Sequence, residues 1–415
     1  MRAARAHALI ALGNEGARVR IVVHDYSGHP FQVQLSRELA RRGHEVLHLS
    51  CDSFVTGKGA LSRQPDDPPT FSVEAVSLGQ RFEKYSYRKR LGQERRYGRL
   101  LGDRVREYRP DVVLSSNTPL FAQSVFQRHL DPATRFVFWQ QDVYSVAMGD
   151  AARKGIPVVG ALVAKWFERL ERKMLEASDE IVIISADFRP ILDRWGIDPT
   201  RVTVVENWAP LSEIEPGPHQ NDWSSAHGLD GSVVVLYAGT LGLKHNPNLL
   251  LQLATRNAQP NPNVRVVVIS EGLGADWLAE QQRALGVDNL LLLPFQPYEE
   301  LSSVLASADI VVAILEPEAG VFSVPSKVLT YHCAGRPILG SIPPENLAAR
   351  IITREGSGLV SDPGDVEQFV EAAGRILGDE TVRAQMGAHA RAYAEKTFDI
   401  ARIGDEFEAV LQKPS

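Results

Sequence analysis

The hydrophobic residues of the chain fall into short runs that alternate with amphipathic segments. The run VRIVV at residues 19–23 is rich in β-branched residues, and the segment after Gly28 places Val33, Leu35 and Leu39 near one face of a helix. A second apolar run, VLHLS, follows. Strand, helix and strand within about thirty residues form a βαβ unit, whose crossover is almost always right-handed and whose sheet is parallel.

The same alternation continues for the rest of the first half of the chain. Continuous apolar runs, typical of strands in a sheet that is covered on both faces, lie at 111–116, 135–139, 180–185 and 202–207, with helical segments such as 161–176 between them. The first half is therefore predicted to be a doubly wound α/β domain.

The pattern breaks after Asn207 and then restarts. The segment APLSEIEPGPHQNDWSSAHGLDG contains three prolines, many polar residues and no strand-like run, as expected for a connection between domains. From Ser232 onward, further strands are predicted at 233–239, 264–270, 289–295, 309–315 and 337–342, and the tail from Asp379 to about Leu411 reads as helices. We therefore predict two Rossmann-like α/β domains, with an N-terminal extension at 1–18, a first domain at 19–210, a linker at 211–231, a second domain at 232–390, and a helical tail at 391–415 that could return to the first domain.

Length and composition agree with two soluble domains. The chain has 415 residues, more than one hydrophobic core usually organises, with 44% hydrophobic and 23% charged residues. Its two cysteines, Cys51 and Cys333, have no metal-ligand spacing, which favours a reducing, cytoplasmic setting. No apolar run approaches the ~18–20 residues of a membrane-spanning helix. The N-terminus has a short apolar stretch after two arginines, but we favour an extension over a signal peptide, because Ala6 to Leu12 is at the lower limit of length for one.

Two loops of the second half have the character of anion sites. In open parallel sheets, ligands bind beyond the carboxyl ends of the strands, and two such domains are expected to form a cleft. The loop AGTLGLKHNP combines Gly239, Gly242 and Lys244 with a predicted helix start, in which Asn246 is the N-cap and Pro247 lies in the first turn. At a helix start, free amides and the helix dipole favour negative charge. A plain strand-to-helix turn with a solvated lysine is the alternative.

A second loop repeats this combination. Pro325, Ser326 and Lys327 open a short helix that ends at Gly335. Two helix starts that each carry a lysine would suit a diphosphate, since each lysine acts as a point charge while backbone amides supply directional bonds.

Taken together, the motifs resemble a known family. The segments AGTLGLKHNP, SVPSKVLTYHCAGRP, LSRELARRGHEV and ISADFRPILDRWGI, in their order along the chain, are similar to those of the retaining glycosyltransferases of family four, which have the GT-B fold. The PSK triplet and ENWAP look most like bacterial colanic-acid and O-antigen transferases that move fucose-type or N-acetylated sugars. The resemblance implies metal-free transfer from a nucleotide diphosphate sugar, with a UDP-sugar favoured, to a glycan or lipid-linked acceptor.

The resemblance also implies roles for residues of the second half. Lys244 matches a phosphate-contacting lysine, Ser326 and Lys327 match the diphosphate-facing helix start, and Lys244 and Lys327 would stabilise the leaving diphosphate. Thr330 and Phe322 stand where many relatives carry two glutamates, one of which binds the ribose. Glu316 and Glu318 could substitute for it, or could form an ordinary acidic loop. The implied donor site thus comprises Gly239, Thr240, Lys244, Glu271, Phe295, Glu318, Ser326, Lys327 and Thr330.

In the first half, Asp142 occupies the position of an acidic residue beside the transferred sugar, with Gln141 where relatives have a histidine. Asp142 would orient the acceptor or stabilise positive charge at the anomeric carbon, unless it is only a turn residue. Gly28 and His29 are candidates for a cleft loop that lies under the donor phosphates or beside the acceptor, where His29 could equally be a hydrogen-bonding turn residue. No DxD, HExxH or His/Cys cluster occurs, so we expect neither metal nor other cofactor.

A basic segment stands out against the acidic chain. The net charge is −6, yet Arg81–Arg109 contains eleven basic and four acidic residues, a charge of +7. Its interspersed apolar residues favour a helix with one apolar and one cationic side. We expect this helix to contact an anionic membrane or a lipid diphosphate acceptor rather than nucleic acid, with a solvated helix face as the alternative; the residues concerned are Lys84, Arg88, Lys89, Arg90, Arg95 and Arg96.

Two other functions are compatible with the same motifs. A nucleotide-sugar epimerase of the same architecture would convert the donor without any acceptor. A non-catalytic sugar-nucleotide-binding subunit is conceivable because the glutamate pair is missing. The predicted localisation is cytoplasmic, with peripheral attachment to the inner membrane face if the basic segment binds lipid.

Overall fold

The computed structural model describes residues 18–53, 60–80, 87–146, 148–149, 157–241, 245–315, 317 and 320–413. The chain folds into two compact units, one formed by Met1–Glu206 with Ile400–Ser415 and the other by Asn207–Asp399. The segment expected as a linker, 211–231, lies within the second unit and contains the short helix α8 (Asp222–Ala226). Of the expected tail at 391–415, the part from Ile400 belongs to the first unit.

The first unit is built on a parallel sheet of seven strands in the order β3-β2-β1-β4-β5-β6-β7. The register pairs Val23 of β1 with His48 on one side and Leu114 on the other. Strands β4 and β5 are buried along their whole length, and β1 and β2 are buried except for their first residue, as their continuous apolar runs require. The strands are β1 (Arg20–Asp25), β2 (Glu45–Cys51), β3 (Phe71–Val76), β4 (Val112–Ser116), β5 (Arg135–Gln140), β6 (Glu180–Ile183) and β7 (Val202–Val204).

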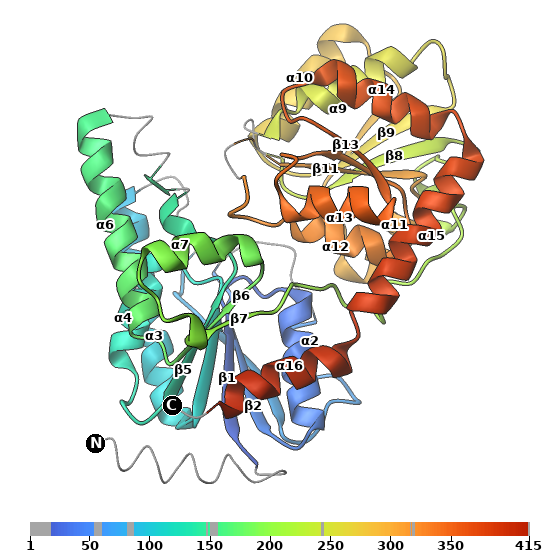
Figure 1. The fold of residues 1–415 in the computed structure, drawn as a ribbon. Helices are drawn as coiled ribbons and strands as arrows, with labels where there is room; N and C mark the ends of the chain where they lie inside the picture. The colour runs from blue at the N-terminus through green and yellow to red at the C-terminus, as the bar shows by residue number, and fades with distance from the viewer. Residues whose placement is uncertain are drawn as a thin grey trace. The chain divides into compact units, whose positions relative to one another are not determined.

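Helices cover both faces of this sheet (Figure 1). One face is covered by α3, α4 and α6, and the other by α2 and α16. Pro30 opens α2, where its fixed φ suits the first turn. The helices are α2 (Pro30–Arg41), α3 (Tyr87–Tyr108), α4 (Leu120–His129), α6 (Pro157–Glu176), η1 (Ala186–Phe188), α7 (Arg189–Arg194), η2 (Pro199–Arg201) and α16 (Ile400–Gln412).

The last helix, α16, is fixed to the first unit by polar and aromatic contacts. The guanidinium of Arg42 donates to Asp405 at 2.6 Å and to Glu408 at 2.7 Å. Beneath these ion pairs, the ring of Phe407 packs edge-on against Trp139, with 4.7 Å between ring centroids. Both rings are fully buried, so α16 completes the core of a unit that begins almost 400 residues earlier.

The second unit repeats the plan with six parallel strands in the order β10-β9-β8-β11-β12-β13. On one face, α9, α10 and α14 share a hydrophobic core with the sheet. On the other face lie α11, α12 and α13, and α15 packs against α12. The strands are β8 (Val233–Ala238), β9 (Val264–Ile269), β10 (Leu290–Leu293), β11 (Ile310–Ile314), β12 (Ile338–Ser341) and β13 (Gly358–Ser361). The remaining helices are α9 (Asn248–Asn257), α10 (Leu273–Leu285), η4 (Tyr298–Glu300), α11 (Leu301–Ala306), α12 (Ser326–Cys333), α13 (Leu347–Glu355), α14 (Val366–Leu377) and α15 (Glu380–Thr397).

The doubly wound α/β fold predicted for each half is confirmed, and every predicted strand is present. Two strands were missed, β3 and β13. Both lie at the edge of a sheet, where one side of the strand is unpaired and the apolar pattern weakens: only Phe71 and Val76 of the six residues of β3 are buried.

Candidate active site

Four loops of the second unit meet at one edge of its sheet. Strands β10, β9, β8 and β11 are neighbours and run parallel, so the segments after their carboxyl ends lie along the same edge. These segments carry most of the residues predicted to bind a donor: Gly239 and Thr240 after β8, Glu271 after β9, Phe295 after β10, and Ser326 and Lys327 at the start of α12.

The ammonium group of Lys327 lies against the loop that follows β8. Its Nζ is 4.0 Å from the centre of the Tyr237 ring, within the range of a cation–π contact. A Cβ atom added to Gly239 would lie 2.8 Å from this Nζ, and Gly239 has a φ of +136°. The backbone conformation therefore requires glycine here, and a Cβ would in addition displace the end of the Lys327 side chain. The two motifs singled out in the sequence are in direct contact.

Partial burial changes the acid–base behaviour of this lysine. Desolvation lowers the pKa of Lys327 to about 7. An anion placed beside Nζ would supply the charge that the surroundings lack and would raise the pKa again. Lys327 is thus a group whose charge near neutral pH depends on whether an anion is bound.

Two hydrogen bonds hold the loop that follows β8. The hydroxyl of Tyr237 donates to the carbonyl of Thr240 at 2.8 Å. The amide of Gly274, at the start of α10, donates to the carbonyl of Leu241 at 3.0 Å. A Cβ on Gly274 would lie 2.6 Å from that carbonyl oxygen, so the glycine lets the helix approach the loop closely. This packing is what the GLG triplet at 272–274 provides.

The other predicted donor residues are only partly placed. Lys244 and Glu318 lie outside the described residues, as does Glu316. Thr330 is half-buried on α12, while Glu271 and Ser326 are exposed and Phe295 keeps 41% of its surface exposed. Helix α9 begins at Asn248 with Pro247 at its N-cap, so the prediction that Asn246 caps this helix is wrong; Asn246 instead has a φ of +45°.

In the first unit, His29 belongs to a cluster of polar side chains at the carboxyl ends of β1 and β4. The fully buried carboxylate of Asp25 accepts the backbone amides of Ser27, at 3.0 Å, and of His29. The ring Nδ1 of His29 lies 3.4 Å from Asp25 Oδ1 and 3.1 Å from the side-chain nitrogen of Asn117. The positive φ of Gly28, +76°, turns the chain so that these groups converge.

The electrostatics of this cluster raise the pKa of His29 above its ordinary value. Burial opposes the charged imidazole, but the charge and hydrogen bond of Asp25, with a further contribution from Asp142, raise the pKa of His29. Burial alone would raise the pKa of Asp25. The charge and hydrogen bonds of His29 outweigh this effect, so the pKa of Asp25 is lowered. The predicted candidates His29 and Asp142 therefore influence each other, whereas Asp25 and Asn117 were not predicted.

The loop that carries Asp142 is fixed by hydrogen bonds to a buried carboxylate. Glu171 of α6 has no exposed surface, and its two oxygens accept the backbone amides of Tyr144, at 3.2 Å, and Ser145, at 2.8 Å. The side chain of Gln140 donates to it at 3.2 Å. Burial raises the pKa of Glu171 to about 7, against the opposing effect of these hydrogen bonds. Glu171 was not predicted from the sequence.

Comparison with known protein families identifies both units. Residues 28–208 match the model described as glycosyl transferase 4-like domain, and residues 219–393 match the model described as glycosyl transferases group 1. The chain carries two glycosyltransferase domains. The cluster of Asp25, His29 and Asn117 thus lies in the 4-like domain or directly before it, and Gly239 and Lys327 lie in the group 1 domain.

Individual relatives agree with this assignment. A D-inositol 3-phosphate glycosyltransferase of Rhodococcus erythropolis is 27% identical over 237 residues, which cover 54% of this chain and 52% of the relative. The chain spans about half the length of such curated relatives.

Solved structures show the same fold at low sequence identity. Sucrose-phosphate synthase from Thermosynechococcus elongatus has a TM-score of 0.72 at 15% identity, covering 95% of this chain and 98% of its own. Anabaena HepE, solved with UDP and glucose, has a TM-score of 0.69 at 17% identity, covering 95% and 100%. WaaG, a glycosyltransferase involved in lipopolysaccharide biosynthesis, has a TM-score of 0.65 at 16% identity, covering 94% and 99%. The predicted GT-B fold is confirmed.

The basic segment of the 4-like domain forms helix α3 from Tyr87 onward. Its apolar side, including Tyr97, Leu101 and Val105, is fully buried against the domain. Of the predicted contact residues, Lys89, Arg95 and Arg96 are exposed, and Arg90 is half-buried and donates to Glu94 at 2.7 Å. Lys84 and the side chain of Arg88 lie outside the described residues.

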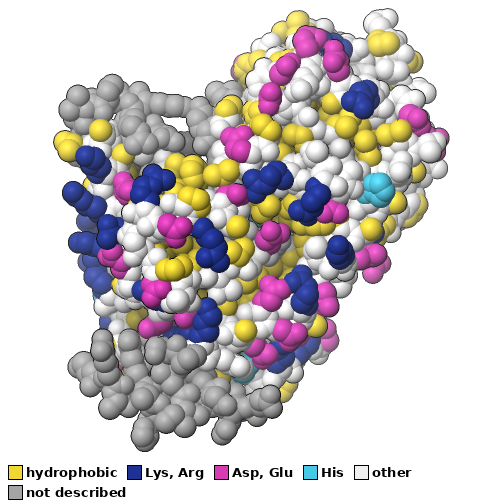
Figure 2. All heavy atoms as spheres, viewed as in Figure 1, with side chains coloured by type: hydrophobic (Ala, Val, Ile, Leu, Met, Phe, Trp, Pro, Cys, Tyr) yellow, Lys and Arg dark blue, Asp and Glu magenta, His cyan; other side chains and the backbone are white. Residues whose placement is uncertain are grey.

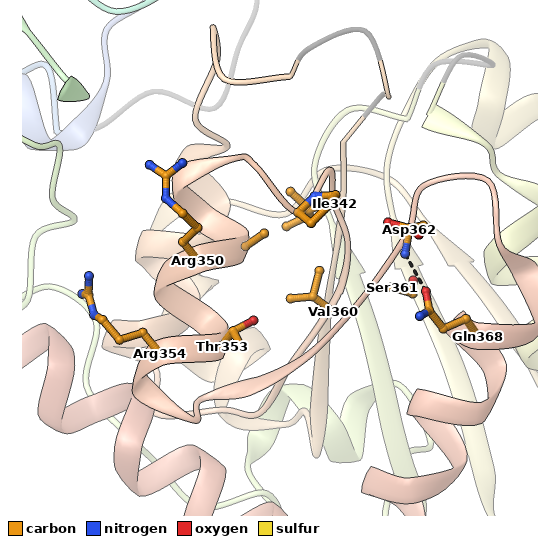
Figure 3. A pocket seen from close by; sticks show the side chains of 10 residues that line it. Ile342, Arg350, Thr353, Arg354, Val360, Ser361, Asp362 and Gln368 are labelled. Carbon is orange, nitrogen blue, oxygen red and sulfur yellow. Dashed lines mark hydrogen bonds between the residues drawn. The ribbon is translucent and has the colours of Figure 1, made fainter. Parts of the chain in front are cut away.

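A pocket of about 480 Å³ opens in the group 1 domain at the carboxyl ends of β12 and β13 (Figure 3). Arg350 and Arg354 of α13 lie on one side of it, and Asp362 lies on the other, where its amide donates to Gln368 at 2.7 Å. The predicted donor residues that the structure describes lie elsewhere, in the loops after β8 to β10 and on α12, and none of these lines this pocket.

Two further features concern metals and membranes. Within the described ranges, no group of three or more His, Cys, Asp or Glu side chains is arranged to hold a metal ion. Each helix in the described part of the chain is too short or too polar to cross a bilayer.

Proposed function

We propose that this protein transfers a sugar from a nucleotide diphosphate sugar, with UDP-sugars favoured, to a glycan or lipid-linked acceptor in bacterial surface polysaccharide synthesis. The observation that carries the proposal is the contact between Lys327 and the Gly239 loop at the carboxyl edge of a parallel sheet. Further support comes from the two glycosyltransferase domains, from HepE with its bound UDP and glucose, and from WaaG and its role in lipopolysaccharide synthesis.

On the donor side, the diphosphate would lie beside Lys327 and Lys244, with Ser326 at the start of α12 and Thr240 on the facing loop. Negative charge grows on the diphosphate as the glycosidic bond breaks, so a cation placed there stabilises the transition state more than the ground state. Phe295, Glu271, Thr330 and Glu318 would surround the nucleoside.

On the acceptor side, Asp142 and His29 would orient the attacking hydroxyl. For transfer with retention, the bond from the anomeric carbon to the phosphate oxygen breaks, and the acceptor oxygen bonds to the same face of the sugar. The leaving phosphate oxygen takes the hydroxyl proton, and the nucleoside diphosphate departs. No protein nucleophile and no metal ion take part in this scheme, and transfer activity should persist in excess EDTA.

Binding and turnover can be tested separately. A thermal-shift panel of UDP-, GDP-, dTDP- and CMP-sugars identifies the donor, because a ligand that binds only the native state raises the melting temperature. Lys327→Ala should abolish the shift and the transfer to a polyisoprenyl-diphosphate glycan acceptor, whereas Lys396→Ala, which removes an exposed lysine of α15, should change neither.

The outcomes distinguish the alternative functions. Full transfer activity in Lys327→Ala would contradict the site assignment. Conversion of the donor sugar into an isomer without any acceptor would identify an epimerase. A donor that binds but is never turned over with any acceptor would favour a non-catalytic binding subunit.

A further inference from the structure

Helix α6 of the 4-like domain exposes two large apolar side chains on its outer side. Leu162 keeps 67% of its surface exposed and Trp166 keeps 45%, and they stand one helical turn apart. The indole of Trp166 also leans on the domain, since its centroid lies 5.3 Å from that of Phe121 and 5.1 Å from that of Phe167. Together the two side chains form a small apolar patch that an apolar surface can cover.

Exposed basic side chains are numerous on α6 and on the neighbouring part of the domain that α3 forms. On the described parts of α3 and α6, nine lysine and arginine side chains are exposed, against three acidic ones, although the whole chain carries a net charge of −6. Figure 2 shows lysine and arginine side chains gathered along the edge of the domain where α6 runs, below hydrophobic side chains at its upper end. The nine are Lys89, Arg95, Arg96, Arg99, Arg106, Lys165, Arg169, Arg172 and Lys173, and the three are Asp103, Glu107 and Glu176.

The two helices both pack against α4. Leu91 of α3 and Val163 of α6 pack on the same small core formed around Leu120 and Phe121 of α4. The helix α3 also approaches α4 closely, since a Cβ added to its Gly98 would lie 2.4 Å from a carbonyl oxygen of α4. The charges of α3 and the apolar pair of α6 therefore keep a fixed relation to each other.

We propose that the exposed face of α3 and α6 docks the protein on an anionic lipid bilayer, with Leu162 and Trp166 entering the interfacial layer and the lysines and arginines resting on the headgroups. Tryptophan prefers this layer because its ring is apolar and its N–H is polar. Anionic lipid headgroups attract the basic side chains, whereas an apolar partner protein would not attract them. The inference rests on the proposed function only for the biological role of docking, which is access to a lipid-linked acceptor. Binding to the bilayer itself requires neither donor nor acceptor.

The test is co-sedimentation of the full chain with vesicles of mixed phosphatidylglycerol and phosphatidylcholine, and with vesicles of phosphatidylcholine alone. Wild type should bind the mixed vesicles and not the neutral ones. Replacing Leu162 and Trp166 together by alanine should weaken binding at least tenfold. Replacing Arg95, Arg96 and Arg99 by serine should weaken it about a hundredfold, since each basic side chain contributes about fivefold. Added salt should weaken the wild type strongly, because it screens the charges.

Matched controls come from the group 1 domain. Leu273 and Leu285 are each 59% exposed on α10, so their replacement by alanine removes equally exposed leucines outside the proposed face. Replacing the exposed Arg256, Arg283 and Arg375 by serine removes the same charge elsewhere. Both controls should bind like wild type, and all variants should keep the wild-type melting temperature and its shift with a UDP-sugar.

The outcomes are decisive. Equal binding of wild type to both kinds of vesicle, no binding to either, or the same loss in the control variants would overturn the proposal. If wild type bound no vesicles, an acidic partner protein would be the alternative ligand of this face. Loss of vesicle binding with an unchanged UDP-sugar shift would support docking, and a missing UDP-sugar shift in wild type would contradict the proposed function but not the docking.

Discussion

Binding of a UDP-sugar should be accompanied by uptake of a proton on Lys327. Desolvation lowers the pKa of this lysine to about 7 in the free protein, although an exposed lysine has a value of 10.5. A diphosphate beside Nζ would restore the charged form, because an opposite charge within a few ångströms favours the ammonium. The proton must come from the solution, since a UDP-sugar has no group that titrates near neutral pH.

The size of the effect follows from the pKa. About one pH unit above the free-protein value, near pH 8, Lys327 would be ~10% protonated without ligand and fully protonated with it, so uptake should be about 0.9 proton per UDP-sugar. Near pH 6 it should fall to about 0.1 proton. Above pH 7, the affinity should consequently decrease by up to tenfold for each unit of pH.

Isothermal titration calorimetry in buffers of different ionisation enthalpy measures this uptake directly. The variant Lys327→Arg keeps a permanent charge at the same position, so its uptake should be close to zero at every pH. Lys396→Arg, on the exposed side of α15, should behave like wild type. Uptake below about 0.2 proton near pH 8 in wild type, or unchanged uptake in Lys327→Arg, would refute the assignment of Lys327 as the ligand-dependent cation.

The same pKa shift predicts how stability depends on pH without ligand. Between about pH 7 and the unperturbed value of 10.5, the unfolded chain binds a proton at Lys327 that the folded chain does not bind. The free energy of unfolding should therefore rise with pH across this window, and the cost of burying a charged lysine should be fully present below it. Urea unfolding at several pH values should show this slope in wild type and its loss in Lys327→Arg.

Three further predictions concern single residues whose contacts the structure defines. Glu171→Gln should lower kcat at least tenfold and leave UDP-sugar binding unchanged, because the side-chain amide of glutamine cannot accept both backbone amides of the loop. Steady-state kinetics would measure the loss of kcat, with Glu176→Gln, an exposed position on the same helix, as the control. Gly239→Ala should weaken UDP-sugar binding at least tenfold by displacing Lys327. Gly43→Ala, where φ is also positive (+98°) but the space around the residue is open, should not weaken it; a titrated thermal shift compares the two variants. Phe407→Ala should lower the free energy of unfolding by about 3–5 kcal/mol in urea, since it empties the space against Trp139, and an unchanged stability would show that α16 does not complete that core.

The central strands could be predicted because consecutive residues in them are buried and therefore apolar. In β1, five of six residues are buried, and every residue of β5 and β11 is buried, so each strand forms an apolar run that stands out locally. The edge strand β13 has only four residues, with Gly358 at its start, and takes its place through pairing with β12 rather than through its own composition. Pairing between distant segments is a tertiary property that a local pattern does not contain.

The candidate site divides in the same way. Glycines, a proline and a lysine at a helix start are local signals, and they led to Gly239 and Lys327. Asp25 and Asn117 are far apart in the sequence and meet only because β1 and β4 are neighbours in the sheet. Glu171 looks like any acidic residue of an amphipathic helix; its position on the buried side of α6, opposite exposed Arg172 and Lys173, was the one available signal.

Under the proposed function, the charges of the two domains match the two halves of the reaction. The group 1 domain brings Lys327 to its donor loops, where the departing diphosphate gains negative charge. The 4-like domain brings the carboxylates of Asp25 and Asp142 beside His29, where positive charge develops on the sugar and on the attacking hydroxyl. Because the pKa of Lys327 is about 7 without ligand, much of the donor-side charge would form only when the diphosphate arrives. A cation formed in this way favours the diphosphate over uncharged sugars, since only an anion can raise the pKa of the lysine that binds it.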